Sequence, residues 1–548
     1  IFPLFPALPR PAAGPANGAG PLYLSTDSGQ LRPLVWDTSH GPIPVYVDGG
    51  GAFTYDFDGV TPFLTIERAN EITAFAFNQW SSVPTSTFRA QIAGTIASKT
   101  GIADVTAANA GQVYNVENGY GFWVLYDTDG SILEEYFGVP RSAVLGIAFP
   151  EFGDGEGHIV EATAVMNGWN VWDTDIGGNQ IAGVFTHEFG HALNLSHSQV
   201  NGPMVYQSYT YAPQYPGVKG CVAPLHRYDY PDGYGATPAD PKIIETMFPF
   251  IDNGGQAGAE QSTIDSADDI AGISNLYPTA EYASSRGSIS GVLRLKDGRT
   301  EYSGINVIAR NVDDPLGDAV SSMTGDQTQG ELGPDGRFTI RNLTPGQRYV
   351  VYLEEITSGG YPTTPMMMVS QGEYWNEAEG NDPVADKACD ATPILAEAGV
   401  TKTANFTYNG YLKGVQFTPV VSAALVRVSK SGSRASGTTG YEGFFWDEKK
   451  GFELLPEGLN VSHGAMDRNG NRTLVTADPD GNGIQEPVIW GNNQMIELGD
   501  LNGDTCSSGG ATGEISASGW DLDDSASKAV GFAYVLNKGG GRCGRFGE

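Results

Sequence analysis

The order of hydrophobic and polar residues predicts an amphipathic helix among strands in the first half of the chain. Residues 65–80, TIERANEITAFAFNQW, place apolar side chains at near-helical spacing, so that one helix face is apolar: Ile66, Ala69, Ile72, Phe75, Ala76 and Trp80. Strand-like runs surround this helix at residues 42–47, 121–127, 143–149 and 159–167. This order favours an α+β domain in which the helix packs on a mixed sheet.

After Pro278 the helical period ends and two different β patterns follow. Residues 287–355 contain short alternating strands separated by Gly, Pro and Asp turns, which is typical of an all-β sandwich. From Tyr411 onward, an apolar or aromatic residue before a Trp, a hairpin and a hydrophobic return strand occur twice. The spacing between Trp446 and Trp490 matches the length of one propeller blade, which is roughly 40 to 45 residues.

A third unit of this repeat begins near residues 519–524. Two or three units are too few for a propeller ring, which needs at least about four blades. The segment is therefore either cut short at Glu548 or an open β structure, which other subunits could complete.

The run HEFGHALNLSH, from His187 to His197, contains three of the seven histidines in the chain. On a helix, His187 and His191 project from one face, and Glu188 lies beside them as an acid that need not be a ligand. Asn194 tolerates the left-handed conformation, so the chain can turn there and bring His197 round as a third nitrogen ligand. A surface helix that carries a pair of histidines is the alternative, and the third His disfavours it.

Three neutral imidazoles leave the fourth position of a zinc ion for water, which is the arrangement of a catalytic site. The metal acidifies this water and polarises a carbonyl, while Glu188 can take the proton of the water and deliver it to the leaving amine. The motif therefore predicts hydrolysis of peptide bonds, with Zn²⁺ as cofactor and a protein or peptide as substrate.

These residues resemble the extended zinc motif of metzincin peptidases, with Asn194 where the family usually has Gly. Further along, ETMFPF (residues 245–250) is similar to the Met-turn of the matrixin branch, and residues 264–278 resemble the last helix of a matrixin catalytic domain. The resemblance implies that Met247 lies beneath the zinc ligands. It also implies that the strand before the zinc helix, here residues 159–167, forms the edge of the cleft and can pair with an extended substrate.

A second methionine competes for the Met-turn. Met204, in GPMVY, follows His197 closely, and its Tyr206 would suit the metzincin branches in which a Tyr follows the Met. Met247 is favoured because it directly precedes the closing helix. In that case residues 198–244 are a long insertion, rich in Tyr, Pro and Gly.

The patterns and the resemblance together predict a multidomain chain of four segments. A Pro/Gly/Ala-rich segment (1–24) precedes an α+β, metzincin-like catalytic domain (25–283). The β-sandwich (284–410) resembles the carboxypeptidase regulatory-like, transthyretin-like modules appended to secreted bacterial enzymes, and reads as a spacer or binding platform. The last segment (411–548) holds the propeller-like β repeats, which are expected to be incomplete.

Charge and hydropathy narrow the class of protein. The 64 acidic residues exceed the 31 basic ones and give a net charge of −33, which disfavours binding to nucleic acid and anionic membranes because both present phosphate. No apolar run reaches about 18 residues, so no membrane span is expected. We expect a secreted protein, extracellular or at the cell surface. The chain begins at Ile1 without an initiating Met or signal peptide, which suggests a processed or partial chain.

Acidic turns recur along the chain and are candidates for structural Ca²⁺. Hard oxygen ligands of the kind that Ca²⁺ prefers occur at Asp127 and Asp129 and at Asp478, Asp480 and Asn482. The Asp-Gly element is also a standard hairpin turn, so both interpretations stay open.

Two function classes follow from the sequence. The first is a secreted zinc endopeptidase that uses Glu188 as its general base. The second is an extracellular structural or adhesive protein, in which the β segments carry the main role through self-assembly or association with a cell surface. The intact Glu188 and the three histidines favour the first class.

Overall fold

The computed structural model describes residues 31–202, 244–251, 261–325 except 297, 300 and 303, 336–356 except 355, 373–379 and 391–408. It also describes two short N-terminal strands and separate strands and turns between residues 424 and 547. The chain divides into two compact units, Ile1–Gly410 and Tyr411–Glu548. Most of the expected N-terminal segment and most of the expected insertion lie outside the described residues.

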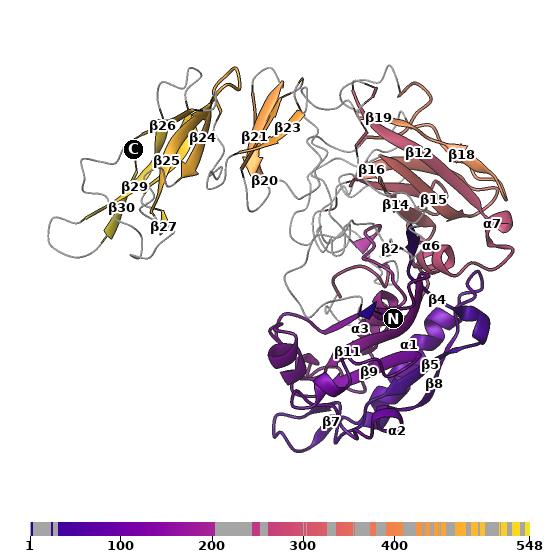
Figure 1. The fold of residues 1–548 in the computed structure, drawn as a ribbon. Coiled ribbons are helices and arrows are strands. Elements are labelled where there is room, and N and C mark those ends of the chain that lie inside the picture. The colour runs from indigo at the N-terminus through magenta and orange to yellow at the C-terminus, as the bar shows by residue number, and fades with distance from the viewer. Residues whose placement is uncertain are drawn as a thin grey trace. The chain divides into compact units, whose positions relative to one another are not determined.

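A mixed seven-stranded sheet forms the first part of unit one (Figure 1). Four strands run parallel in the order β11 (His158–Asn167), β9 (Gly121–Asp127), β5 (Ile43–Val47) and β8 (Ala90–Thr95), and β10 (Gly146–Gly153) runs antiparallel to β11. Two short strands complete the sheet, since β4 (Val35–Trp36) pairs with β11 and β1 (Phe2–Pro3) pairs with β10. The sheet and its helices make an α+β domain.

The expectation that residues 159–167 form the edge of the cleft is wrong. Strand β11 is paired on both sides, with β10 and with β9. Strand β10 takes the outer place, and β1 pairs with it only at Phe152 and Gly153. The hairpin from β10 to β11 causes this order, because β11 joins the parallel strands and leaves β10 outside. Alternating apolar residues mark both as strands but do not tell which one lies at the edge.

Helix α1 (Ile66–Ser81) packs on one face of the sheet. It begins at Thr65, whose hydroxyl accepts a hydrogen bond from the backbone N–H of Arg68. Its buried residues are Ala69, Ile72, Thr73, Ala76, Phe77 and Trp80. The prediction was wrong for Phe75, which is 39% exposed, whereas Phe77 is 2% exposed. Phe77 follows Thr73 by one turn and precedes Trp80 by three positions, so it continues the buried stripe, while Phe75 falls on the polar flank.

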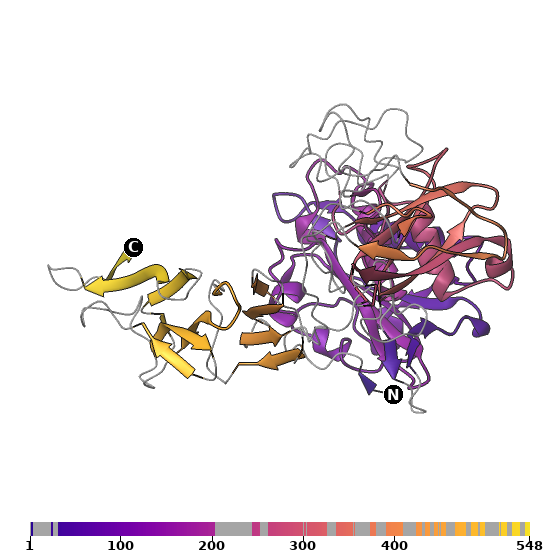
Figure 2. The same cartoon turned by 90° about the horizontal axis from the view of Figure 1, so that it is seen from above.

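Helix α3 (Ile181–Ala192) lies beside α1 on the same face of the sheet (Figure 1), and Figure 2 gives the same fold from above. It carries the first two histidines. The buried carboxylate of Asp175 caps the N-terminus of this helix, because it accepts hydrogen bonds from the N–H groups of Gln180 and Ile181 at 2.9 and 2.7 Å. The indole N–H of Trp80 donates to the carbonyl of Thr186 at 2.8 Å. Helix α3 is therefore fixed at its start and at its middle.

The opposite face of the sheet is covered by shorter elements around Trp123 and Leu125. They include α2 (Ile96–Thr100), the 3-10 turn η2 (Ala110–Gln112) and the π-helical turn η3 (Ile132–Tyr136). The remaining small elements are η1 (Thr38–His40), η4 (Gly168–Asn170) and the two hairpins β2–β3 (Tyr23–Ser25, Leu31–Pro33) and β6–β7 (Thr54–Tyr55, Pro62–Leu64).

Two further helices lead from the sheet domain into a β module. They are α6 (Ala267–Leu276) and α7 (Tyr282–Ser285). The module contains two four-stranded sheets. One is formed by β15 (Arg337–Leu343), β12 (Gly287–Leu295), β18 (Thr401–Thr403) and β19 (Phe406–Tyr408), and the other by β14 (Ala319–Met323), β13 (Asn306–Asn311), β16 (Arg348–Glu354) and β17 (Ile394–Leu395). A transthyretin-like sandwich stays a prediction for this module.

The described residues of unit two form three separate sheets, built mainly from antiparallel pairs. They comprise β20 (Ala424–Val428), β21 (Arg434–Thr438), β22 (Gly443–Asp447) and β23 (Gly451–Leu454); β24 (Thr473–Ala477), β25 (Ile484–Gly491), β26 (Gln494–Glu497) and β27 (Glu514–Ile515); and β28 (Ala517–Leu522), β29 (Ala529–Leu536) and β30 (Cys543–Gly547). The propeller-like arrangement stays a prediction. None of the helices in the described part of the chain has the length and apolar character needed to cross a membrane.

The packing of α3 predicts the cost of removing one of its inner side chains. Phe189 is fully buried and its ring stacks on Phe77 with centroids 4.3 Å apart. We expect Phe189→Ala to lower the free energy of unfolding of unit one by about 3–5 kcal/mol, because it leaves a cavity. Denaturant unfolding measures this loss. Phe75→Ala is the matched control on an exposed site, and an equal loss in both variants would contradict the assigned packing.

Candidate functional site

The end of helix α3 determines where the third histidine lies. Asn194 has φ 72°, in the left-handed region, as predicted. The N–H of Leu195 donates to the carbonyl of Gly190 at 3.0 Å, and that of Asn194 donates to His191 at 2.9 Å, which together form a Schellman motif. The side-chain amide of Asn194 also donates to the carbonyl of Leu34. The chain therefore reverses at Asn194, and the turn brings His197 back towards the helix.

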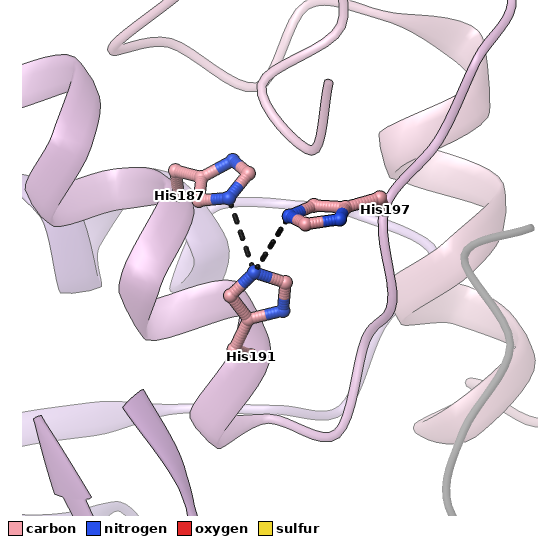
Figure 3. A group of neighbouring side chains, drawn as sticks. All are labelled: His187, His191 and His197. Carbon is pink, nitrogen blue, oxygen red and sulfur yellow. Dashed lines mark hydrogen bonds between the residues drawn. The ribbon is translucent and has the colours of Figure 1, made fainter. Parts of the chain in front are cut away.

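The three histidine side chains converge on one point (Figure 3). His187 and His191 extend from the helix and His197 from the extended chain that follows it. The Nε2 atom of His191 lies 3.1 Å from Nε2 of His187 and 3.2 Å from Nε2 of His197. In the described part of the chain, this is the only group of three or more His, Cys, Asp or Glu side chains that is close enough to share a metal ion.

Backbone carbonyls fix the tautomers of the first two rings. The Nδ1–H of His187 donates to the carbonyl of Thr246 at 2.7 Å, and that of His191 donates to the carbonyl of Leu195 at 2.8 Å. In the neutral form, both Nε2 atoms then carry a lone pair and no proton. Two lone pairs that face each other at 3.1 Å repel unless a proton or a metal cation lies between them, so the arrangement fits a metal site.

Charge on the rings is disfavoured. Burial lowers the pKa of His187 to about 3, with the neighbouring His191 acting in the same direction. Burial lowers the pKa of His191 to about 4. Both rings are therefore neutral near pH 7, which is the form that binds metal.

The donor set fits zinc. Zinc binds imidazole nitrogen at about 2.0–2.1 Å in tetrahedral geometry, which places two ligand nitrogens about 3.3 Å apart. The measured separations of 3.1 and 3.2 Å are close to this value. Three nitrogen ligands leave one tetrahedral position for a water molecule or a substrate.

Glu188 points from α3 towards strand β10. Its carboxylate accepts a hydrogen bond from the backbone N–H of Ala148, and burial raises its pKa to about 8. A divalent cation at the histidines would lower that pKa, because it favours the ionised carboxylate. A side chain at Gly146 would meet Glu188, since a Cβ there would lie 2.9 Å from its Cγ. Strand β10 thus packs directly against the side chain of Glu188.

Met247 lies beneath the part of α3 that carries the histidines. It is fully buried, and a Cβ on Gly190 would lie only 2.3 Å from its sulfur. Its backbone carbonyl accepts a hydrogen bond from the N–H of Ser198, at 2.9 Å. The competing Met204 and Tyr206 lie outside the described residues.

Sequence reasoning missed the carboxylates that hold the turn around Met247. The side chain of Asp269 accepts hydrogen bonds from the N–H groups of Thr246 and Met247 at 2.7 and 3.1 Å. Burial raises the pKa of Asp269 well above its usual range, and these two donors oppose that shift. Asp269 belongs to the pattern in residues 264–278, which predicted a helix but could not reveal a contact with a turn about 20 residues earlier.

A cleft of about 650 Å³ runs past the histidines and Glu188. Backbone and side chains of β10, from Gly146 to Pro150, line one side of it. The other described lining residues are largely apolar and include Tyr114, Phe137, Trp172, Val184, Phe248, Phe250 and Ile251. Glu188 is the only carboxylate among the described lining residues.

The candidate calcium residues act as turn caps where the structure describes them. The buried carboxylate of Asp127 accepts hydrogen bonds from the N–H groups of Ile132 and Leu133, at 3.1 and 2.9 Å. Asp129 accepts one from Ser131 at 2.9 Å. Calcium at these positions stays a prediction, and Asp478, Asp480 and Asn482 lie outside the described residues.

The contacts of Asp269 predict that it supports the metal centre from a distance. Asp269→Ala leaves two buried N–H groups without their acceptor, at about 1–3 kcal/mol of unfolding free energy for each. Because Thr246 holds the ring of His187, we also expect zinc affinity to fall by about 10–100-fold. Denaturant unfolding and a chelator competition measure the two effects. The exposed Asp265→Ala is the control, and unchanged zinc affinity in Asp269→Ala would argue against this role.

A model of the matrixin family matches residues 140–217, which include β10, β11, α3 and the three histidines. No curated protein matches the chain. The family match and the histidine triad support a metzincin-type zinc-peptidase domain in unit one, with zinc as the metal that both suggest.

Proposed function

We propose that the chain is a secreted zinc-dependent endopeptidase, matrixin-like in its catalytic domain. The observation that carries this proposal is the convergence of three histidine Nε2 atoms beside one buried carboxylate, in an open and mostly apolar cleft. His187, His191 and His197 would hold the metal. A purely structural zinc site would instead close the fourth position with a protein ligand.

When bound there, zinc acidifies a water molecule and polarises a substrate carbonyl. Glu188 is the general base, which takes the proton of the attacking water and later passes it to the leaving amine. Thr246 and Leu195 hold the rings of His187 and His191 in the tautomer that leaves Nε2 free. Met247 supports the helix beneath these rings.

Strand β10 is the proposed binding edge for the substrate. On the side away from β11, β10 pairs with β1 at Phe152 and Gly153, and its residues from Gly146 to Pro150 line the cleft. An extended peptide that lies in the cleft alongside β10 would extend the sheet by backbone hydrogen bonds. The apolar lining of the cleft favours peptides with apolar side chains near the cleaved bond.

Secretion and a place at the cell surface are supported by the net charge of −33 and the β-rich second half of the chain. The alternative function is an extracellular structural or adhesive protein, which uses its β segments for self-assembly. The intact Glu188 and the cleft favour the enzyme, because a scaffold has no need for a buried acid beside an open metal site.

The role of Glu188 can be tested by an isosteric change. Glu188→Gln keeps an acceptor for the N–H of Ala148 but cannot take a proton from water. We expect zinc content close to that of the wild type and a fall in kcat for peptide cleavage of about 10²–10⁴-fold. The exposed Glu156→Gln is the control. Loss of zinc in Glu188→Gln would mean that the residue is a ligand, and full activity would mean that it is not the base.

The third ligand can be tested through metal affinity alone. Replacing His197 by Ala removes one of three protein ligands, so its effect should exceed the roughly 100-fold upper range for groups that only orient a ligand. Competition with a chelator measures the zinc dissociation constant. His40→Ala changes an exposed histidine away from the cleft and should leave this constant unchanged. Wild-type affinity in His197→Ala would remove His197 from the ligand set.

A further inference from the structure

The segment directly after His197 is buried between the metal centre and the β module. Residues 198–202 form this segment, which we call the ligand strap, and all five are buried. Val200 lies in an apolar cluster with residues of the module, namely Ile308, Ala319, Val350, Tyr352, Tyr374 and Ala391. A side chain three positions beyond the proposed ligand is thus part of the core of the neighbouring module.

On the side of the metal centre, the strap is held by the turn that contains Met247. The buried carboxylate of Glu245 accepts hydrogen bonds from the N–H groups of Val200, Asn201 and Gly202, at 2.6, 3.0 and 3.1 Å. The N–H of Ser198 donates to the carbonyl of Met247. These contacts fix one edge of the strap.

On the other side, the strap is held by strand β13 of the module. The guanidinium of Arg310 is fully buried and donates to the side-chain oxygen of Asn201 at 2.7 Å and to the carbonyl of Val200 at 3.0 Å. The amide of Asn306 donates to the carbonyl of Gln199 at 2.7 Å. The module therefore contacts three successive residues of the strap.

Further donors of Arg310 are used within the module. Its Nε–H donates to the hydroxyl of Tyr352 at 3.1 Å, and Nη1 also donates to the carbonyl of Pro315 at 2.5 Å. The five donors of a guanidinium lie in a fixed plane, so these acceptors set the direction in which the group reaches the strap. Lysine has no such fork and cannot replace all these bonds.

A second bridge lies close by. Asp268, in the first turn of α6, accepts hydrogen bonds from the hydroxyl of Ser198 and from the N–H of Ser321 in β14. The strap is therefore connected to the module directly through Arg310 and Asn306, and indirectly through Asp268.

We propose that the β module positions the third histidine ligand, with Arg310 as the positioning residue. The inference rests on the proposed function, because it takes His197 as a ligand. His187 and His191 are fixed by the helix, whereas His197 lies on irregular chain whose course depends on what holds the next five residues. The module is then part of the peptidase and not a spacer.

The experiment uses the full chain with Arg310→Met and Arg310→Lys. Circular dichroism checks that each variant is folded, chelator competition measures zinc affinity, and the visible spectrum of the Co²⁺-substituted protein reports the ligand geometry. We expect Arg310→Met to weaken zinc binding by about 10-fold or more and to change the Co²⁺ spectrum, with Arg310→Lys between it and the wild type. Tyr349→Phe, which removes a buried hydroxyl from the module away from the strap, should match the wild type.

The inference is overturned if folded Arg310→Met has the zinc affinity and Co²⁺ spectrum of the wild type, or if Tyr349→Phe loses as much affinity. Should Arg310→Met not fold, Asn306→Ala decides, since it removes a single bond to the strap. A several-fold loss of affinity there supports the inference, and wild-type affinity contradicts it. Failure of the proposed function is seen separately, in a wild-type chain that neither binds zinc nor cleaves peptides.

Discussion

The candidate metal centre depends on two ring nitrogens that are held 3.1 Å apart. The backbone enforces this contact, because the other nitrogen of each ring donates to the carbonyl of Thr246 or of Leu195. Without a cation the two lone pairs repel, and with one they become ligands. The turn at Asn194, which supplies Leu195, and the turn at Met247, which follows Thr246, can therefore be understood as devices that hold the rings in place.

Buried carboxylates hold the chain at three places near this site where it leaves regular structure. Asp175 starts α3, Asp269 holds the turn at Met247, and Glu245 holds the strap. Each accepts backbone N–H groups that have no partner in a helix or sheet, which offsets the cost of burying the acid. Some of the many acidic residues of this chain are therefore buried and structural, while others are exposed charges. The net charge does not distinguish the two groups.

Local sequence patterns were enough to predict the histidine site. Contacts between distant segments could not be predicted from such patterns. The four-residue spacing of His187 and His191 and the backbone preference of Asn194 are local properties, so both were predicted. The buried stripe of α1 was mostly predicted, but Phe75 and Phe77 differ only in their angle around the helix. The order of β10 and β11 depends on the whole sheet, and the contacts of Asp269 and Arg310 join distant segments, so no pattern along the chain reveals them.

Magnitudes explain why a module would matter to a site that it does not line. Ordering a residue costs about 1–2 kcal/mol of conformational free energy, so ordering the five residues of the strap costs about 5–10 kcal/mol. The free energy of zinc binding to small structural sites is about 10–16 kcal/mol. If the metal alone had to order the strap, the ordering cost would cancel much of this binding free energy. In the proposed role of the module, Arg310, Asn306 and the apolar contacts of Val200 order the strap before metal binds, and a preordered third ligand leaves more of the binding free energy for affinity. Folding of the module and occupancy of the metal centre are on this argument thermodynamically linked, with each favouring the other.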